Sequence, residues 1–382
     1  MEKEIGRSRS IAVAGKTLEA HFAVHRSGTG PGLLLLADEA GLDAGIRARA
    51  GLFGEEGYAV LAVAGLSEAG EVRAAADALR AMPEQAGGIG VLGHGAGGAL
   101  ACRAASAFDA AVAFDPVGLA EASEIGAACP ALLVFGTRDS AEAEQAAGRI
   151  ERGLDRSDGS AVLRYPSAAP GFAIPHRAGF DKRSDSLAHS RALGLLRRAL
   201  GPHYDLVALF EAHVRHEFET RDVDATMATM IDEPYVNHVP TLAGGVGHDM
   251  LKRFYKYHFV DQNSRERSST PVSETVGPDR IVLETVVRFR HDRVLDRYFP
   301  CIAPTGKMVE IPTLLLVRFR GDRVCHEHIY WDQASALSQI GALDADGLPI
   351  AGAEAAAKVL DETRPSNIFM QDAWAESEGK PI

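Results

Sequence analysis

Apolar residues in the first half of the chain come in short uninterrupted runs that alternate with amphipathic segments. Residues 32–37 (GLLLLA) form such a run, which is typical of a strand buried on both faces of a parallel sheet. Two short strands are expected before it, within residues 9–27. After it we expect strands at 58–64, 88–92, 110–114 and 131–135, and helices at 46–56, 71–82 and 98–106. Because strand and helix alternate, the sequence predicts an α/β doubly wound sheet.

The pattern changes after a helix at 186–200, which ends at Gly201-Pro202, a common helix stop. Helices are then expected at 204–221, 224–230 and 249–258, and strands at 272–276, 280–291, 309–320 and 324–332. Helices followed by an antiparallel sheet predict an α+β cone-shaped barrel that holds a small apolar ligand between its layers. We therefore expect a domain at 1–201, a second at 202–350, and a C-terminal helix and tail at 351–382.

Residues 324–332 (VCHEHIYWD) concentrate groups that transfer protons. Strand alternation divides their side chains between two faces, with His326, His328, Tyr330 and Asp332 on one face and Cys325, Glu327, Ile329 and Trp331 on the other. We expect the first face to line the cavity, where desolvation would raise the pKa of Asp332 and make it a general acid/base. Tyr330 and His328 would then donate hydrogen bonds to a developing enolate oxygen. Two alternatives stay open: a strand whose polar face meets water, and Asp332 as the N-cap of the following helix.

Further histidine and aromatic side chains are expected at the same cavity. His238 is a weaker catalytic candidate, and substrate contacts are expected from His326, Trp331, His291 and Tyr235. A metal site built from His238, His326 and His328 is an alternative, because two histidines two apart on a strand can share an ion. No carboxylate or cysteine completes that set at a familiar spacing. We therefore expect neither a metal nor another cofactor.

Composition and charge limit the partners. The chain is 46% hydrophobic and 24% charged, as in an ordinary soluble globular protein, and its net charge is -12. Nucleic acids and anionic membranes attract clustered positive charge, so neither is an expected partner. The four cysteines have no CxxC spacing, which argues against a disulfide framework and favours a reducing cytoplasm. No apolar run approaches the roughly 18 residues of a membrane span, and we expect a homodimer that binds a small hydrophobic molecule.

Residues 90–98 (GVLGHGAGG) are rich in glycine, and we expect a strand there to lead into a tight turn and then a helix. This is the arrangement of a nucleophile elbow, in which glycines allow a strained turn to present a side chain at the helix N-terminus. Further motifs stand at 38–42 (DEAGL), 55–58 (EEGY) and 135–139 (FGTRD). Residues 10–200 therefore resemble the dienelactone hydrolase family of the α/β-hydrolase fold. The same glycines fit neither a dinucleotide fingerprint nor a P-loop.

The resemblance implies a catalytic triad that this chain has lost. Gly95 stands at the position of the family's cysteine nucleophile, and it has no side chain with which to attack a carbonyl. Pro170 stands where the family's catalytic histidine precedes Gly-Phe. Asp139, the triad acid by position, and Glu39 are then left with no nucleophile to orient. We interpret this half as a pseudo-hydrolase.

The second half carries a different set of motifs. They are 237–240 (NHVP), the glycine loop at 244–247 with Lys252-Arg253-Phe254 after it, 321–324 (GDRV), 330–332 (YWD) and 337–341 (LSQIG). Residues 204–345 resemble the SnoaL-like polyketide cyclases of the nuclear transport factor 2-like superfamily. The resemblance implies a cavity aspartate that acts as general acid/base without a cofactor, a role that transfers to Asp332 by position.

Three functions are compatible with these patterns. The first is a cofactor-independent cyclase, isomerase or hydrating enzyme, which acts in the second domain on a small hydrophobic carbonyl compound such as a polyketide. The second is an ester or lactone hydrolase in the first domain, using a substitute base such as His94 or His176. The third is a non-catalytic protein that binds small molecules.

Overall fold

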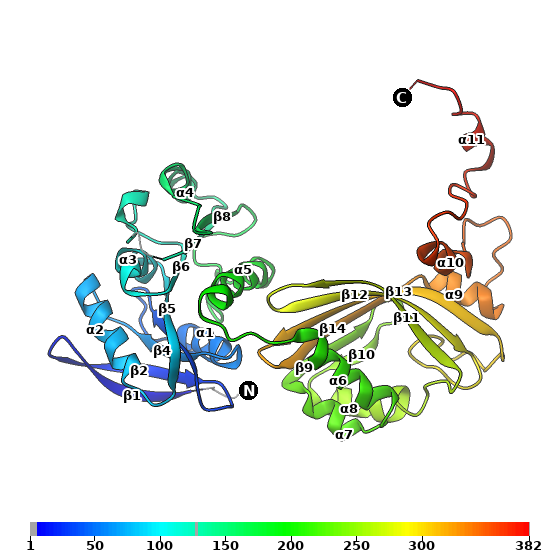
Figure 1. Ribbon diagram of the computed structural model, residues 1–382, viewed down its shortest axis with the longest axis horizontal. Helices are drawn as coiled ribbons and strands as arrows, with labels where there is room; N and C mark the ends of the chain where they lie inside the picture. Colours follow the sequence, from blue (N-terminus) through cyan, green and yellow to red (C-terminus); the bar gives the residue numbers. More distant parts are fainter. Residues whose placement is uncertain (1–5, 127–128, 382) are drawn as a thin grey trace. The chain divides into compact units, whose positions relative to one another are not determined.

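The computed structural model describes residues 6–126 and 129–381. The chain divides into two compact units, Met1–Tyr204 and Asp205–Ile382, here called unit 1 and unit 2. Unit 1 contains an eight-stranded sheet and unit 2 a six-stranded sheet (Figure 1). Among the described residues, no helix combines the length and the apolar character that crossing a bilayer requires.

The sheet of unit 1 has the strand order β1-β2-β4-β3-β5-β6-β7-β8. Its strands are β1 (Arg7–Val13), β2 (Lys16–Val24), β3 (Gly30–Leu36), β4 (Ala59–Val63), β5 (Gln85–His94), β6 (Ala110–Phe114), β7 (Ala131–Gly136) and β8 (Ala161–Tyr165). β1 and β2 form an antiparallel hairpin that joins β4 antiparallel, and the strands from β4 to β8 pair in parallel. Burial on both faces explains the uninterrupted apolar runs, since every residue of β4 and β6 is buried.

Helices cover both faces of this sheet (Figure 1). They are α1 (Ala44–Glu55), α2 (Ala69–Arg80), α3 (Ala96–Ala104), α4 (Ala141–Gly153) and α5 (Lys182–Leu200), with short 3-10 turns η1 (Ala105–Ala107) and η2 (Ala122–Glu124). One core cluster packs α2, α3 and α4 on one face, and another packs α1 and α5 on the other. The predicted doubly wound α/β arrangement is confirmed. Helix α4 was missing from the predicted elements because it buries only Ala147 and Ile150.

Unit 2 is a six-stranded sheet in the order β10-β9-β14-β13-β12-β11. Its strands are β9 (Met230–His238), β10 (Ala243–Val246), β11 (Arg267–Val276), β12 (Arg280–Arg290), β13 (Met308–Arg320) and β14 (Arg323–Trp331). All neighbours pair antiparallel except β14 and β9, which run parallel. The sequence pattern did not predict β9 and β10, because Pro234 and two exposed acids interrupt the alternation of β9 and β10 is rich in glycine.

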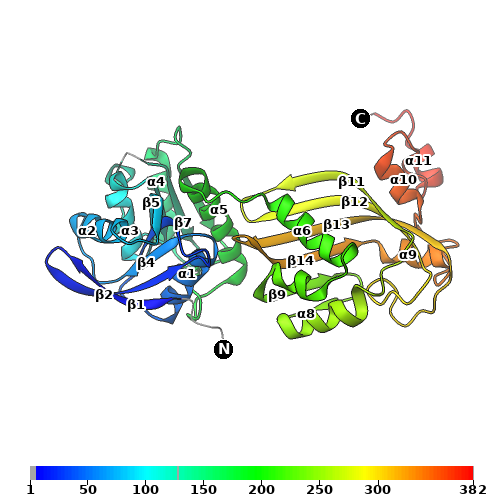
Figure 2. The same cartoon turned by 60° about the horizontal axis from the view of Figure 1, so that its bottom comes forward.

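The helices α6, α7 and α8 lie against one face of the unit 2 sheet (Figure 2). The helical segments of this unit are α6 (Leu206–Phe218), α7 (Val223–Ala228), α8 (His248–Phe254), the π-helical turn η3 (Tyr255–Phe259), α9 (Gln333–Ile340), α10 (Glu354–Leu360) and α11 (Gln371–Ala375). The predicted α+β cone is therefore confirmed, although α6 and α7 precede the sheet in the chain whereas α8 follows strands β9 and β10. Helix α6 buries Leu206, Phe210, His213 and Glu217, so two ionisable side chains belong to its inner face.

Candidate functional site

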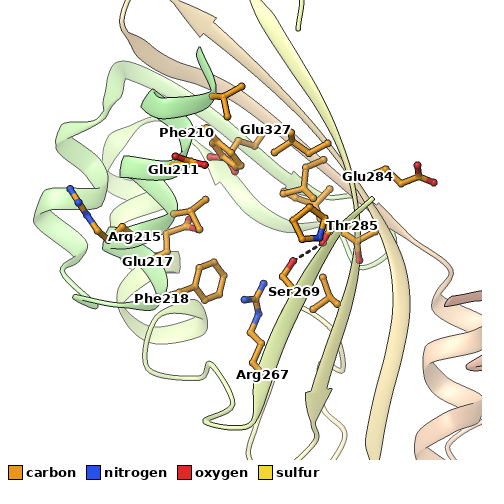
Figure 3. Close-up of a pocket in the computed structure, with 18 of the residues that line it drawn as sticks. Phe210, Glu211, Arg215, Glu217, Phe218, Arg267, Ser269, Glu284, Thr285 and Glu327 are labelled. Carbon is orange, nitrogen blue, oxygen red and sulfur yellow. Dashed lines mark hydrogen bonds between the residues drawn. The ribbon is translucent and has the colours of Figure 1, made fainter. Parts of the chain in front are cut away.

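A cavity of about 850 Å³ lies between helix α6 and the inner face of the unit 2 sheet. This volume is within the range of small-molecule sites, roughly 300–1,000 Å³. Apolar side chains of α6 and of strands β9, β12, β13 and β14 supply much of its wall: Phe210, Val214, Val236, Leu283, Val287, Leu315 and Ile329. Figure 3 shows Glu217, Phe218, Glu327 and Arg267 among the polar and aromatic side chains between helix and sheet.

Strand β14 presents to the cavity the face opposite to the expected one. Glu327 and Ile329 line the cavity, whereas His326, His328 and Tyr330 do not. Glu327 and Ile329 are 4% and 7% exposed, and Tyr330 is 39% exposed. The prediction that the His326, His328 and Tyr330 face lines the cavity is therefore wrong. A strand buries its more apolar face. In β14 that face carries Cys325, Ile329 and Trp331, all of which are buried.

Asp332 lies outside the cavity wall, contrary to the prediction. It is the N-cap of α9, and its carboxylate accepts hydrogen bonds from the Ala334 N–H at 2.9 Å and the Ser335 hydroxyl at 2.5 Å. A carboxylate that caps a helix satisfies backbone donors which would otherwise be unpaired. The alternative that Asp332 is the N-cap of the following helix is therefore confirmed.

The four other candidates take different positions in unit 2. His238 lines the cavity, with Nδ1 3.2 Å from the Ala243 carbonyl oxygen, and burial lowers its pKa to about 3. Trp331 is buried and donates from Nε1 to the Gln333 side chain at 2.6 Å. His291 is also buried and its ring is tilted against that of Phe299, while Tyr235 lies against His326 and His328 with ring centroids 4.8 and 5.4 Å away. The prediction that Trp331, His291 and Tyr235 contact a substrate in the cavity is wrong, because none of them lines it.

The same arrangement separates the three histidines that were considered as metal ligands. His238 lies on the cavity side, where its ring packs against Trp331, whereas His326 and His328 pack against Tyr235. Within residues 6–126 and 129–381, no group of three or more His, Cys, Asp or Glu side chains is arranged to hold a metal ion.

Four buried ionisable side chains meet at the cavity wall instead. Nε2 of His213 lies 3.2 Å from Oε1 of Glu217 and 3.3 Å from Oε1 of Glu327. Tyr255 is buried beside both carboxylates, whose negative charges help to raise the pKa of its hydroxyl. On its other side the His213 ring is held by Thr229, whose hydroxyl lies 2.6 Å from Nδ1. We call His213, Glu217, Tyr255 and Glu327 the acid/base cluster.

Three secondary-structure elements supply the members of the acid/base cluster. His213 and Glu217 are four residues apart on α6, so they share its inner face. Glu327 alternates into the inner face of β14, and Tyr255 begins the π-helical turn η3. The sequence offered one usable signal for Glu327: it is the only charged residue on a strand face otherwise made of Cys325, Ile329 and Trp331.

Burial and mutual charge set the protonation of the cluster. Burial alone would lower the pKa of His213, but the carboxylates of Glu217 and Glu327 outweigh it and raise the pKa to about 10. Burial raises the pKa of Glu327, and the positive charge of His213 opposes that rise. Burial also raises the pKa of Tyr255 well above its usual range. At neutral pH the cluster therefore contains an imidazolium, a neutral phenol and a carboxyl group with increased proton affinity.

In unit 1 the backbone makes the turn of a nucleophile elbow, but Gly95 supplies no nucleophilic side chain. Gly95 (φ 56°, ψ -125°) follows β5 and begins α3. A Cβ atom on Gly95 would lie 3.0 Å from the Cβ of Asp38 and 3.7 Å from Oε2 of Glu39. The guanidinium of Arg177 contacts Asp38, with a second hydrogen bond at 3.0 Å, and bonds Asp43 at 2.8 Å. An ion-pair network therefore stands beside the position that a nucleophile would need.

The remaining triad positions are exposed. The Asp139 side chain is 93% exposed and lies 3.8 Å from Arg138. Pro170 is exposed, and the N–H of the next residue, Gly171, donates to the buried Asp115 at 2.7 Å. His94 stacks on Phe114 at 4.8 Å, and burial lowers its pKa well below the usual value. His176 is exposed.

We expect Gly95→Cys to restore no esterase activity, because Pro170 supplies no base to deprotonate the new thiol. The variant should also lose about 1 kcal/mol or more of unfolding free energy, because Gly95 has a positive φ and a Cβ there approaches Asp38. Hydrolysis of p-nitrophenyl acetate and urea unfolding provide the measurements. Gly70→Cys is the matched control, since a Cβ there has open space; faster hydrolysis by Gly95→Cys than by this control contradicts the expectation.

These two units define a class of protein: an α/β-hydrolase-like unit without an elbow nucleophile, followed by an α+β cone with a buried acid/base cluster. Residues 63–200 match the model of the dienelactone hydrolase family. Carboxymethylenebutenolidase 1 of Cupriavidus pinatubonensis is 31% identical over 127 residues, which are 32% of this chain and 54% of that protein. The chain thus spans about half the length of this curated relative. The predicted resemblance of the first half to the dienelactone hydrolase family is confirmed.

Solved structures similar to the chain divide between the two units. A dienelactone hydrolase from Anabaena variabilis has 18% identity and a TM-score of 0.38, covering 51% of this chain and 98% of its own. A SnoaL-like protein from Jannaschia sp. has 16% identity and a TM-score of 0.30, with coverage of 38% and 99%. A nuclear transport factor 2-like protein from Burkholderia pseudomallei has 18% identity and a TM-score of 0.29, with coverage of 37% and 100%.

Proposed function

We propose that unit 2 is a cofactor-independent acid/base enzyme that moves a proton on a small hydrophobic carbonyl compound, in an isomerisation, cyclisation or hydration. The observation that carries this proposal is the acid/base cluster, in which Glu327 lines a largely apolar cavity and its carboxylate lies 3.3 Å from Nε2 of the buried His213. A carboxylate desolvated in this way accepts protons more readily than one in water.

In the proposed step, the Glu327 carboxylate takes a proton from the carbon next to the substrate carbonyl. The electrons of the broken C–H bond form the enolate, and the protonated Glu327 returns its proton to the same carbon or to a neighbouring one. The positive charge of the His213 imidazolium offsets the repulsion between the carboxylates of Glu217 and Glu327. Protons alone move, so the step consumes no redox cofactor.

Thr313 supplies the proposed site with a hydroxyl that can bind a polar group of the ligand. Its side chain lines the cavity and is 3% exposed, and its hydroxyl has no hydrogen-bond partner among residues 6–126 and 129–381. A buried hydroxyl without a partner is costly, so a ligand acceptor that bonds it contributes to binding. Unit 1, with no nucleophile at Gly95, serves in this proposal as a non-catalytic partner domain.

Proton exchange tests the proposal without knowledge of the natural substrate. We expect the protein to accelerate exchange of the α-protons of 2-tetralone, an apolar bicyclic ketone, for deuterium in D₂O. Proton NMR follows the loss of the α-proton signal, and the rate should rise in proportion to protein concentration. Glu211→Gln, which removes an exposed carboxylate at the edge of the cavity, should keep this rate. A rate equal to the buffer background for 2-tetralone and for a panel of smaller ketones and aldehydes contradicts the proposal.

A further inference from the structure

Two arginines in the cavity wall have no acidic partner. Arg267 begins β11, and Arg297 lies in the connection between β12 and β13; both line the cavity. Arg297 is only 3% exposed, yet its Nη1 has no hydrogen-bond acceptor among the described residues, and neither does Nε of Arg267. Neither guanidinium forms an ion pair with a carboxylate of residues 6–126 and 129–381.

Other buried arginines of the chain are paired. Arg49 contacts Asp185, and Arg197 lies 2.8 Å from Glu56. This difference is informative because a buried charge without a counter-ion is costly, and folded proteins normally pair such charges. The unpaired state of Arg297 therefore indicates that its counter-ion arrives with a ligand.

Aromatic rings hold both guanidinium groups in place. Cζ of Arg267 lies 4.0 Å from the ring centroid of Phe218, and Cζ of Arg297 lies 4.2 Å from Phe259 and 4.7 Å from Tyr298. Arg297 also lies 5.8 Å from Phe218, so one ring contacts both cations. Rings stabilise a cation through their faces but offer no hydrogen-bond acceptor to its N–H groups. The donors of both arginines stay available for an anion.

Charges around the pair favour an anion at this one place. Burial lowers the pKa of Arg267, and the neighbouring charge of Arg297 lowers it further, so the two cations repel each other. Glu217 attracts Arg267 from a distance but is engaged with His213. Glutamates 211, 219 and 274 at the cavity edge are exposed, and they repel an anion from the rim. A ligand anion is therefore stabilised beside Phe218 and disfavoured next to these glutamates.

We propose that the ligand of this cavity is an amphipathic carboxylate, whose anionic group is bound by Arg267 and Arg297 while its apolar body extends along the sheet toward Glu327. Guanidinium groups match the planar carboxylate with paired N–H donors. The proposal rests on the proposed function for the carbonyl that Glu327 acts on, and it adds a second, charged anchor to the substrate. The natural substrate is then a hydrophobic oxo-acid.

Binding of two matched probes tests this anchor. Isothermal titration calorimetry compares 2-naphthoate with 2-naphthamide, which has the same ring system but no charge. The wild-type chain should bind 2-naphthoate at least tenfold more tightly. Arg297→Gln should remove that preference and leave the affinity for 2-naphthamide within twofold. Arg253→Gln is the matched control, because Arg253 is an exposed arginine of α8 that is not part of the cavity wall, and it should preserve the preference.

Two results overturn the inference: wild type that binds both probes equally, or Arg297→Gln that weakens both probes by the same factor. The second result would assign Arg297 to aromatic packing alone. Circular dichroism melting checks that each variant is folded; if Arg297→Gln is not, Arg267→Gln must abolish the preference in its place. The same titration in Glu327→Gln separates this inference from the proposed function, because the naphthoate preference must persist there whether or not proton exchange occurs.

Discussion

Glu327→Gln is expected to lower the rate of 2-tetralone proton exchange by a factor of about 10²–10⁴, the usual contribution of a general base. Glutamine keeps the size of the side chain and its hydrogen-bonding capacity, but its amide does not accept a proton from carbon. The loss should appear in the rate at saturating ketone, because the apolar wall that binds the ring system is unchanged. This is the largest effect that the proposed function predicts.

The pH profile and a matched variant make this prediction specific. Because burial raises the pKa of Glu327, the wild-type exchange rate should increase with pH through a midpoint above the range of an exposed glutamate. Glu284→Gln changes another glutamate of the cavity wall, one outside the acid/base cluster whose carboxylate accepts a hydrogen bond from Ser273 at 2.8 Å. It should leave both rate and profile unchanged, and an exchange rate in Glu327→Gln equal to that of Glu284→Gln rules out Glu327 as the base.

His213→Gln is expected to destabilise unit 2 by roughly 3–5 kcal/mol near pH 6, the cost of removing one partner from a buried ion pair. His213 is fully buried between Glu217 and Glu327, so the variant leaves two carboxylates close together without a positive charge. Urea unfolding of the full chain, followed by circular dichroism, measures the change. His216→Gln on the same helix, where the histidine lies 3.2 Å from Thr220, is the matched control and should shift the midpoint little.

The pH dependence of this loss has a defined sign. The folded-state pKa of His213 is about 10, above its ordinary value of 6.5. A raised histidine pKa stabilises the folded state fully below pH 6.5, and that contribution disappears as pH rises toward 10. The stability difference between wild type and His213→Gln should therefore shrink between pH 6 and pH 9.5. A difference that stays constant over this interval contradicts the assignment of an imidazolium to His213.

Unit 1 was the more predictable half because its signals are local. Strands buried on both faces of a parallel sheet must be apolar throughout, so runs such as 32–37 identify them directly. The elbow could also be predicted, because the glycines around Gly95 indicate a tight turn. The loss of the nucleophile follows from the identity of Gly95, which has no side chain. Helix α4 was missed because few of its residues are apolar, and strand β8 because Arg164 interrupts its short apolar run.

The sequence predicted a cavity in unit 2 but assigned the wrong residues of β14 to its wall. The sequence indicated a cavity under helices and ionisable side chains of the strand at 324–332 facing it, and in the structure Glu327 of that strand lines the cavity. The prediction placed the larger number of polar side chains in the cavity. Packing reversed this choice, because Ile329 and Trp331 contribute more to stability when buried than His328 and Tyr330 do.

The sequence by itself determined which side chains from Cys325 to Trp331 share a face of β14, because alternation along a regular strand depends on backbone geometry. It also determined that Gly95 cannot act as a nucleophile, because that follows from covalent structure. Only the tertiary structure decided which face of β14 turns inward, since that depends on what the helices bury against it. It likewise joined Glu327 to His213 and Glu217, which lie more than a hundred residues earlier in the chain, through packing that no local pattern encodes.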